Sequence, residues 1–163
     1  MSIVLALLLL AVQTPPAPPA PAAPPAKVAA SIARVFGPGA RADTVRVDTL
    51  QVLRVSRADS LLGFAAIGNV LGKDQPITFL VAIDPTDHLK DVDILVYREP
   101  YGGEVAYEPW RRQFRGKTAG DSLRVGKEIR SISGATISVH AVTLGVRRML
   151  AQLTARHQSG AIR

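Results

Sequence analysis

The chain has 163 residues, no cysteine and a formal net charge of +7 at pH 7. This length is sufficient for one domain with a buried core, and the lack of cysteine excludes a disulfide framework and a thiolate metal site. The basic residues are scattered, and no basic motif interleaved with aromatic residues occurs, which argues against nucleic-acid binding. An anionic ligand or an anionic membrane surface is compatible with the charge.

The N-terminal segment differs in composition from the rest of the chain. Residues 3–12 form an almost unbroken apolar run. A membrane-spanning helix needs about 20 apolar residues, so this run is more typical of a signal peptide, although no Lys or Arg precedes it. More than half of the prolines follow directly, in a Pro/Ala-rich stretch that is typical of a semi-rigid spacer. We predict a signal peptide or short membrane anchor over residues 1–13, a linker over 14–26 and one domain over 27–163.

The first half of this domain contains one predicted helix and several predicted strands. Helical spacing of apolar residues over 27–36 predicts a helix that ends at Gly37-Pro38-Gly39. Alternating apolar and polar residues over 44–55 predict amphipathic strands. The apolar, glycine-punctuated run over 61–71 predicts a buried strand, which the turn at 72–76 ends.

Two further strands and two helices complete the domain. The strongly apolar runs 77–83 and 89–97 are separated by a short turn, which predicts an antiparallel hairpin. A short helix is expected from residue 109 to 114 and the longest helix over 135–155. This order of elements predicts an α+β fold with a single antiparallel β-sheet backed by helices. The core stripe predicted for the long helix comprises Val139, Val142, Val146, Met149, Leu150 and Leu153.

The run from Ser131 to Ser138, with the sequence Ser-Ile-Ser-Gly-Ala-Thr-Ile-Ser, opens the long helix. Gly134 and Ala135 lack bulk, so backbone N–H groups at this helix N-terminus can approach a phosphate closely. Ser133 or Thr136 is predicted to cap the helix. We therefore regard this run as a candidate anion site.

The last hydroxyl group of this run, that of Ser138, is expected in the first turn or two of the helix. On a helix it shares a face with Val142 and Gly145, and Gly145 is expected to leave room beside it. A phosphate bound at Ser138 would lie near the positive end of the helix dipole.

The run resembles the S/T-G-A-T-x-T/S motif of the FMN-binding domains in Rnf- and Nqr-type electron-transport subunits. The resemblance extends over roughly residues 62–150. It includes the segments 72–77, 96–99, 102–105 and 113–114. The resemblance implies that FMN is the cofactor and that the last hydroxyl of the motif, here Ser138, carries it through a phosphoester bond.

The chain departs from the family pattern at two positions. Ser138 stands where the redox-pump subunits usually have Thr, and a Ser hydroxyl can form the same ester. Arg130 stands where those subunits usually carry Asp. An arginine at that position could pair with a phosphate.

The resemblance also implies further flavin contacts. The loop that matches residues 99–103 helps to hold the flavin ring in the Rnf and Nqr subunits, so Glu99, Tyr101, Gly102 and Gly103 are candidate contacts. The alternative for them is a plain surface turn. Trp110 and Phe114 can either wall the ring or form a core patch.

The function implied by the resemblance is electron transfer outside the cytoplasm. A separate magnesium-dependent flavin transferase would attach FMN with FAD as the donor, and the chain would exchange electrons with membrane or periplasmic redox partners. The chain would be periplasmic or membrane-tethered, and a redox carrier rather than a catalyst. The alternatives are a flavin-dependent reductase with its own small substrate and a flavin-free sensory or structural module.

No catalytic or metal-ligating residues are predicted. The three histidines, His88, His140 and His157, lack metal-ligand spacing, and His140 points away from Ser138 on a helix. Four aspartates gather on the predicted hairpin and could bind Ca²⁺, but solvated turn and strand residues are the preferred interpretation. They are Asp84, Asp87, Asp91 and Asp93.

Overall fold

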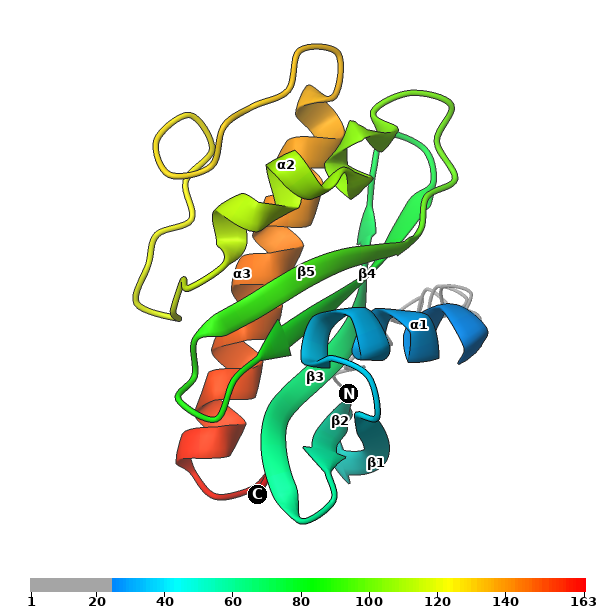
Figure 1. Ribbon diagram of the computed structural model, residues 1–163. Helices are drawn as coiled ribbons and strands as arrows, with labels where there is room; N and C mark the ends of the chain where they lie inside the picture. The colour runs from blue at the N-terminus through cyan, green and yellow to red at the C-terminus, as the bar shows by residue number, and fades with distance from the viewer. Residues whose placement is uncertain (1–24) are drawn as a thin grey trace, which may run out of the picture.

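The structure is a computed structural model that describes residues 25–163 (Figure 1). The predicted signal peptide or anchor, residues 1–13, and most of the predicted linker lie outside the described residues. Within residues 25–163, no helix is long and apolar enough to cross a membrane. The elements in chain order are α1 (Pro25–Phe36), β1 (Arg41–Val47), β2 (Leu50–Arg57), β3 (Ser60–Leu71), β4 (Pro76–Ile83), β5 (Leu89–Val96), η1 (Gly103–Ala106), α2 (Glu108–Arg111), η2 (Arg112–Phe114) and α3 (Thr136–Gln158).

The five strands form one antiparallel sheet in the order β1-β2-β3-β4-β5, so each strand pairs with its neighbours in sequence. Helix α1 lies on one face of this sheet, and α3 with the short helices covers the other (Figure 1). The predicted α+β fold, the hairpin of β4 and β5 and the long C-terminal helix are therefore confirmed. Helix α1 begins two residues before the predicted start of the domain, at Pro25.

The core has two parts because both faces of the sheet are covered. Strand β4 is buried along nearly its whole length, which explains why all of its residues but Thr78 are apolar. On one face Phe79 and Val81 pack with α3, and on the other Leu80 and Ala82 pack with Ile32 of α1. The sheet is therefore the middle of three layers.

Helix α3 packs against β3 and β4 with the predicted stripe, all six members of which are buried. Two details differ from the prediction. The N-cap residue is Ala135, and no side chain caps the helix, so the predicted cap by Ser133 or Thr136 is wrong. The space beside Gly145 is filled by Val70 and Phe79, because this glycine lets α3 approach the sheet closely.

Three of the four aspartates of the β4–β5 hairpin bind side chains of the helical layers. Asp93 forms ion pairs with Arg34 over 3.1 Å and with Arg111 over 3.3 Å. Asp91 is buried and forms ion pairs with Arg34 of α1 and Arg115. The carboxylate of Asp87 lies 2.8 Å from the Nδ1 of His157 on α3, within hydrogen-bond distance. The interpretation of all four as solvated residues is therefore wrong for Asp87, Asp91 and Asp93, because the helices pack against the hairpin. Within residues 25–163, no three His, Asp or Glu side chains group as a metal site would require.

Candidate functional site

Three segments meet at one end of the molecule, at the top of Figure 1: the β3–β4 turn, the loop after β5 and the N-terminus of α3. A cavity of about 170 Å³ lies between them. It is open to solvent on one side, where Tyr101 and Ile137 are 82% and 53% exposed. The residues that line it are Lys73, Asp74, Glu99, Pro100, Tyr101, Gly134, Ala135, Ile137 and Ser138.

Glu99 joins the first two of these segments. Its Oε1 accepts hydrogen bonds from the backbone N–H groups of Asp74, over 2.7 Å, and Gln75, over 2.9 Å. The bonds from Gln75 and Asp74 lower the pKa of Glu99 below its ordinary value, since they stabilise the carboxylate. The carboxylate therefore holds the β3–β4 turn, including Lys73, beside the loop that follows β5.

Trp110 and Gln113 position the segment that leads into α3. The Trp110 Nε1 donates to the carbonyl of Arg130 over 2.9 Å, and the Arg130 N–H donates to the Gln113 Oε1 over 2.8 Å. Trp110 also contacts Phe114 edge to face, with ring centroids 5.2 Å apart, and both rings are buried. Of the two interpretations of these rings, the structure supports the core patch.

A tight turn then sets the direction of α3. The N–H of Ala135 donates to the carbonyl of Ile132 over 3.1 Å, and Gly134 between them has φ +83°. An L side chain rarely adopts this conformation, so glycine is favoured at this position. The first N–H groups of a helix have no partners inside the helix, and here they lie at the cavity.

Ser138 lies at the inner side of the cavity and is only 5% exposed. Its Oγ is 2.8 Å from the phenol oxygen of Tyr97, at the end of β5. Tyr97 also donates a hydrogen bond to the carbonyl of Tyr101. Gly102 packs against this pair: a Cβ at Gly102 would lie 2.6 Å from the Tyr97 oxygen and 2.7 Å from the Ser138 Oγ.

Residues 72–151 match the family model of the FMN-binding domain, and this match contains every residue that lines the cavity. This part of the chain is an FMN-binding domain. Its cofactor is FMN.

The known proteins that are similar to the chain include a subunit of a bacterial enzyme complex and a protein of known structure. One is a subunit of the proton-translocating ferredoxin:NAD(+) oxidoreductase complex of Clostridium ljungdahlii, 35% identical over 86 residues, which are 48% of this chain and 46% of that protein. The similarity thus spans about half of the Clostridium protein. The crystal structure of Shewanella oneidensis NqrC shares 20% identity and superposes with a TM-score of 0.48, covering 70% of this chain and 69% of that one.

The fold brings most of the predicted site residues of the FMN-binding domain together. Glu99, Tyr101, Gly134, Ala135 and Ser138 line the cavity. The other four predicted residues do not line the cavity. Gly102 lies against Ser138 and Gly103 lies against the Tyr97 ring, whereas Ser133 and Thr136 belong to the same segment as Ser138.

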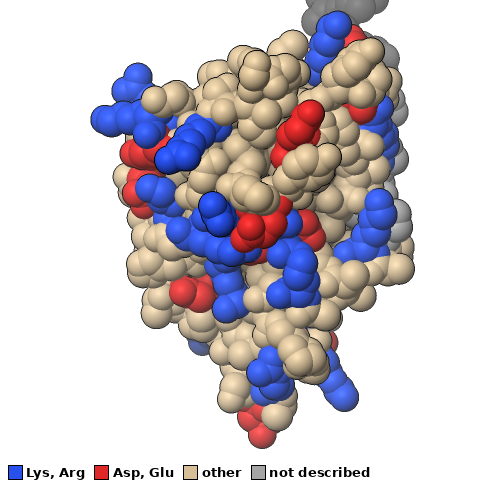
Figure 2. Space-filling model, turned by 45° about the horizontal axis from the view of Figure 1, so that its top comes forward, with Lys and Arg blue, Asp and Glu red and all other residues tan. Residues whose placement is uncertain are grey.

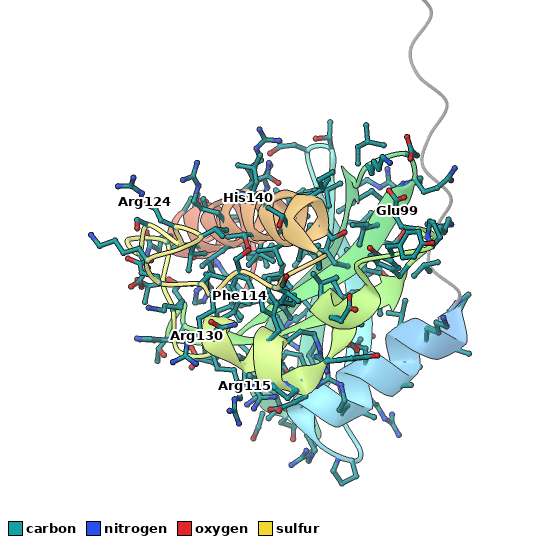
Figure 3. The ribbon with its side chains drawn as sticks, turned by 90° about the horizontal axis from the view of Figure 1, so that it is seen from above. Glu99, Phe114, Arg115, Arg124, Arg130 and His140 are labelled. Atoms are coloured by element: carbon teal, nitrogen blue, oxygen red, sulfur yellow. The ribbon has the colours of Figure 1, made fainter. Side chains whose placement is uncertain are left out.

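Arg130 lies away from this cavity. It lines a separate surface hollow together with Arg112, Gln113 and Lys117. Figure 3 shows Arg130 near the short helices and Glu99 on the other side of the N-terminus of α3. The structure therefore gives no support to the prediction that Arg130 could pair with a phosphate on Ser138.

Lys73, Ile137 and Tyr97 are site residues that the sequence did not single out. Lys73 lies in a predicted turn, and a cation in a turn is a usable signal for an anionic ligand. Ile137 lies inside the motif, and its apolar side chain is exposed in the first turn of α3. Tyr97 lies in the segment 96–99 of the resemblance, but the sequence gives no sign of its partner Ser138, which is 41 residues away.

The residues present fit an FMN phosphate at Ser138. The N–H groups at the start of α3 and the Lys73 ammonium supply hydrogen-bond donors beside the Ser138 hydroxyl. Cationic and anionic side chains are interleaved on this side of the molecule (Figure 2). The cavity itself is lined by Lys73 and by the carboxylates of Asp74 and Glu99, so the helix N-terminus, rather than a net positive charge of the lining, favours a phosphate.

Proposed function

We propose that the chain is an extracytoplasmic electron-transfer protein whose FMN is esterified to Ser138 by a separate flavin transferase that uses FAD. Ser138 would carry the phosphate, and Gly134, Ala135, Glu99 and Tyr101 would contact the cofactor. The observation that carries this proposal is the placement of the Ser138 hydroxyl inside a cavity formed by a helix N-terminus. FMN supplies the redox chemistry, and the fold fixes its orientation.

The size of the cavity favours a carrier over an enzyme with its own substrate. Pockets that enclose a drug-sized ligand measure about 300–1,000 Å³, whereas this cavity measures about 170 Å³. The phosphate end fits inside, and the flavin ring would lie over the exposed side chains of Tyr101 and Ile137. A ring at the surface is accessible to redox partners, which we propose to be membrane or periplasmic proteins.

The proposed location rests on the sequence outside the described residues. An apolar segment over residues 1–13 and a Pro/Ala-rich segment over 14–26 would export or tether the domain of residues 27–163 and hold it at a distance from a membrane. The similar Clostridium protein belongs to a proton-translocating complex by its name, which agrees with a redox partner at a membrane.

Intact mass spectrometry after co-expression with a flavin transferase tests the proposal. We expect wild type to gain the mass of one FMN less one water and to give a fluorescent band on a denaturing gel. Ser138→Ala should lose both signals, whereas the control Ser60→Ala, at an exposed position of β3 outside the motif and the cavity, should keep them. A wild-type chain that gains no mass despite an active transferase would contradict covalent attachment and leave loose FMN binding.

A further inference from the structure

We propose that Tyr97 is a positioning residue for the attachment of FMN: it holds the hydroxyl group of Ser138 in one orientation at the cavity through a hydrogen bond that Ser138 donates. This inference rests on the proposed function, since it concerns the step in which Ser138 is modified. No flavin contact of Tyr97 is required, because it acts through Ser138.

The direction of the hydrogen bond follows from counting hydrogens. A phenol has one O–H hydrogen, and the carbonyl of Tyr101 can only accept, so the hydrogen of Tyr97 is used in that bond. In the remaining contact, over 2.8 Å, the Ser138 hydroxyl must therefore be the donor and the Tyr97 oxygen the acceptor. The lone pairs of the Ser138 Oγ then stay free to attack phosphorus.

The surroundings of Tyr97 keep its phenol protonated. Burial raises the pKa of Tyr97, and the nearby carboxylates of Glu99 and Glu104 raise it further, which outweighs the opposing effect of the bond with Ser138. The phenol therefore stays protonated and keeps its bond to the carbonyl of Tyr101 at neutral pH. It orients Ser138 without acting as a base.

Gly102 makes the contact between Tyr97 and Ser138 possible. A Cβ at this position would lie within 2.7 Å of both oxygens, and Gly102 has φ +90°, where L side chains are strained. Glycine is thus required by two separate constraints. A free serine side chain populates three staggered rotamers. The contact with Tyr97 selects one rotamer of Ser138 before FAD, the source of FMN, binds.

The proposed step is balanced as a phosphoryl-type transfer without oxidation or reduction. The Ser138 Oγ forms a bond to the phosphorus of the FMN half of FAD. The bond between that phosphorus and the bridging oxygen breaks, and AMP leaves with the electron pair. The hydroxyl hydrogen of Ser138 passes to a base of the transferase, and Tyr97 keeps its own hydrogen. Holding a nucleophile in a reactive orientation accelerates such a step.

The test measures the steady-state rate of FMN transfer from FAD by a purified flavin transferase, with the chain at varied concentration and the product followed by intact mass. Tyr97→Phe keeps the ring and removes the phenol oxygen. We expect kcat to fall roughly tenfold, the kinetic equivalent of about one lost hydrogen bond, with KM for the chain unchanged. A small decrease in Tm is also expected, because both hydrogen bonds of the phenol oxygen are lost. The control is Tyr107→Phe, since Tyr107 is 64% exposed.

The possible outcomes separate this inference from the proposed function. An unchanged kcat in Tyr97→Phe overturns the inference. If KM rises and Tm falls while kcat stays the same, Tyr97 has a structural role alone. If Tyr97→Phe does not fold, the test uses 3-fluorotyrosine at position 97, which keeps the shape of tyrosine but has a phenol oxygen that accepts hydrogen bonds more weakly. A slower FMN transfer than in wild type supports the inference, and an equal rate overturns it. A wild-type chain that accepts no FMN overturns covalent attachment itself.

Discussion

Asp91 shows how much of this structure depends on one buried side chain. The carboxylate is 4% exposed, and its Oδ2 accepts hydrogen bonds from Arg34 over 2.7 Å and Arg115 over 3.2 Å. Its Oδ1 accepts the backbone N–H of Val92 and lies 3.8 Å from the guanidinium of Arg111, which is also buried. Because Arg34 belongs to α1, the pair with Asp91 attaches that helix to the sheet.

We predict that Asp91→Asn destabilises the fold. The substitution keeps the volume but removes one of the two carboxylates that pair with Arg34 and Arg111, while Asp93 remains. Losing a hydrogen bond between charged groups costs about 1.5–3 kcal/mol, which is the loss we expect. Urea denaturation at pH 7 measures this loss. Asp43→Asn on the exposed strand β1 is the control and should change the free energy of unfolding by less than about 0.5 kcal/mol.

The loss of stability caused by Asp91→Asn is predicted to depend on pH. Burial tends to raise the pKa of Asp91, but the hydrogen bonds from Arg34, the Val92 N–H and Arg115 outweigh it, so the folded pKa lies below the ordinary 3.8. A lowered folded pKa stabilises the fold above the unfolded value, and this stabilisation is lost as the pH falls from 3.8 through the folded pKa. The stability difference between wild type and Asp91→Asn should therefore narrow below about pH 4. A difference that stays constant into the acid range would contradict this explanation.

At the scale of the element, α3 combines two tasks in one helix. Its N-terminal turn presents Ser138 to the cavity, and its middle packs on the sheet through Gly145. A Cβ at Gly145 would lie 2.6 Å from Val70 Cγ1 and 2.7 Å from Phe79 Cζ, so the helix can approach β3 and β4 this closely only at a glycine. The depth of α3 on the sheet in turn sets where Ser138 meets Tyr97.

We expect Gly145→Ala to lower the free energy of unfolding by about 1 kcal/mol, because overpacking costs about 1–3 kcal/mol and the better helix propensity of alanine returns up to about 1 kcal/mol. Thermal and urea unfolding measure the change. Gly120→Ala is the matched control, since a Cβ at Gly120 would meet nothing closer than 3.6 Å. Equal stabilities of the two variants would show that the helix can move away from the sheet without loss.

At the scale of the whole molecule, the folded unit of residues 25–163 is larger than the segment that matches the family model. That segment begins at residue 72 and so leaves out α1, β1, β2 and β3. Strand β3 pairs with β4 along its length, from Phe64↔Ile83 to Leu71↔Pro76, and it carries Phe64 and Ala66 of the core. Without it, β4 would become an edge strand with an unpaired backbone and an uncovered apolar surface.

We therefore predict that a fragment of residues 72–163 does not fold, whereas residues 25–163 do. Two-dimensional NMR spectra and thermal melts followed by circular dichroism distinguish the two: a dispersed spectrum and a cooperative melt are expected only for the longer piece. A cooperative melt of the shorter fragment would show that β1–β3 and α1 are additions to an autonomous unit.

The sequence was sufficient to predict the elements of this molecule because their signals are local. The alternation in β5, the strongly apolar run of β4 and the stripe of α3 are set by residues a few positions apart. The motif from Ser131 to Ser138 is also continuous in sequence, so its position at the start of α3 could be anticipated.

Only the tertiary structure showed which distant residues meet. Tyr97 and Ser138 are 41 residues apart, Glu99 and Asp74 are 25 apart, and Arg34 and Asp91 are 57 apart. Local periodicity specifies which face of an element is apolar, but not the depth or register at which two elements pack. These depend on the sizes of side chains across the contact, such as Phe79 against Gly145, and hence on the fold as a whole.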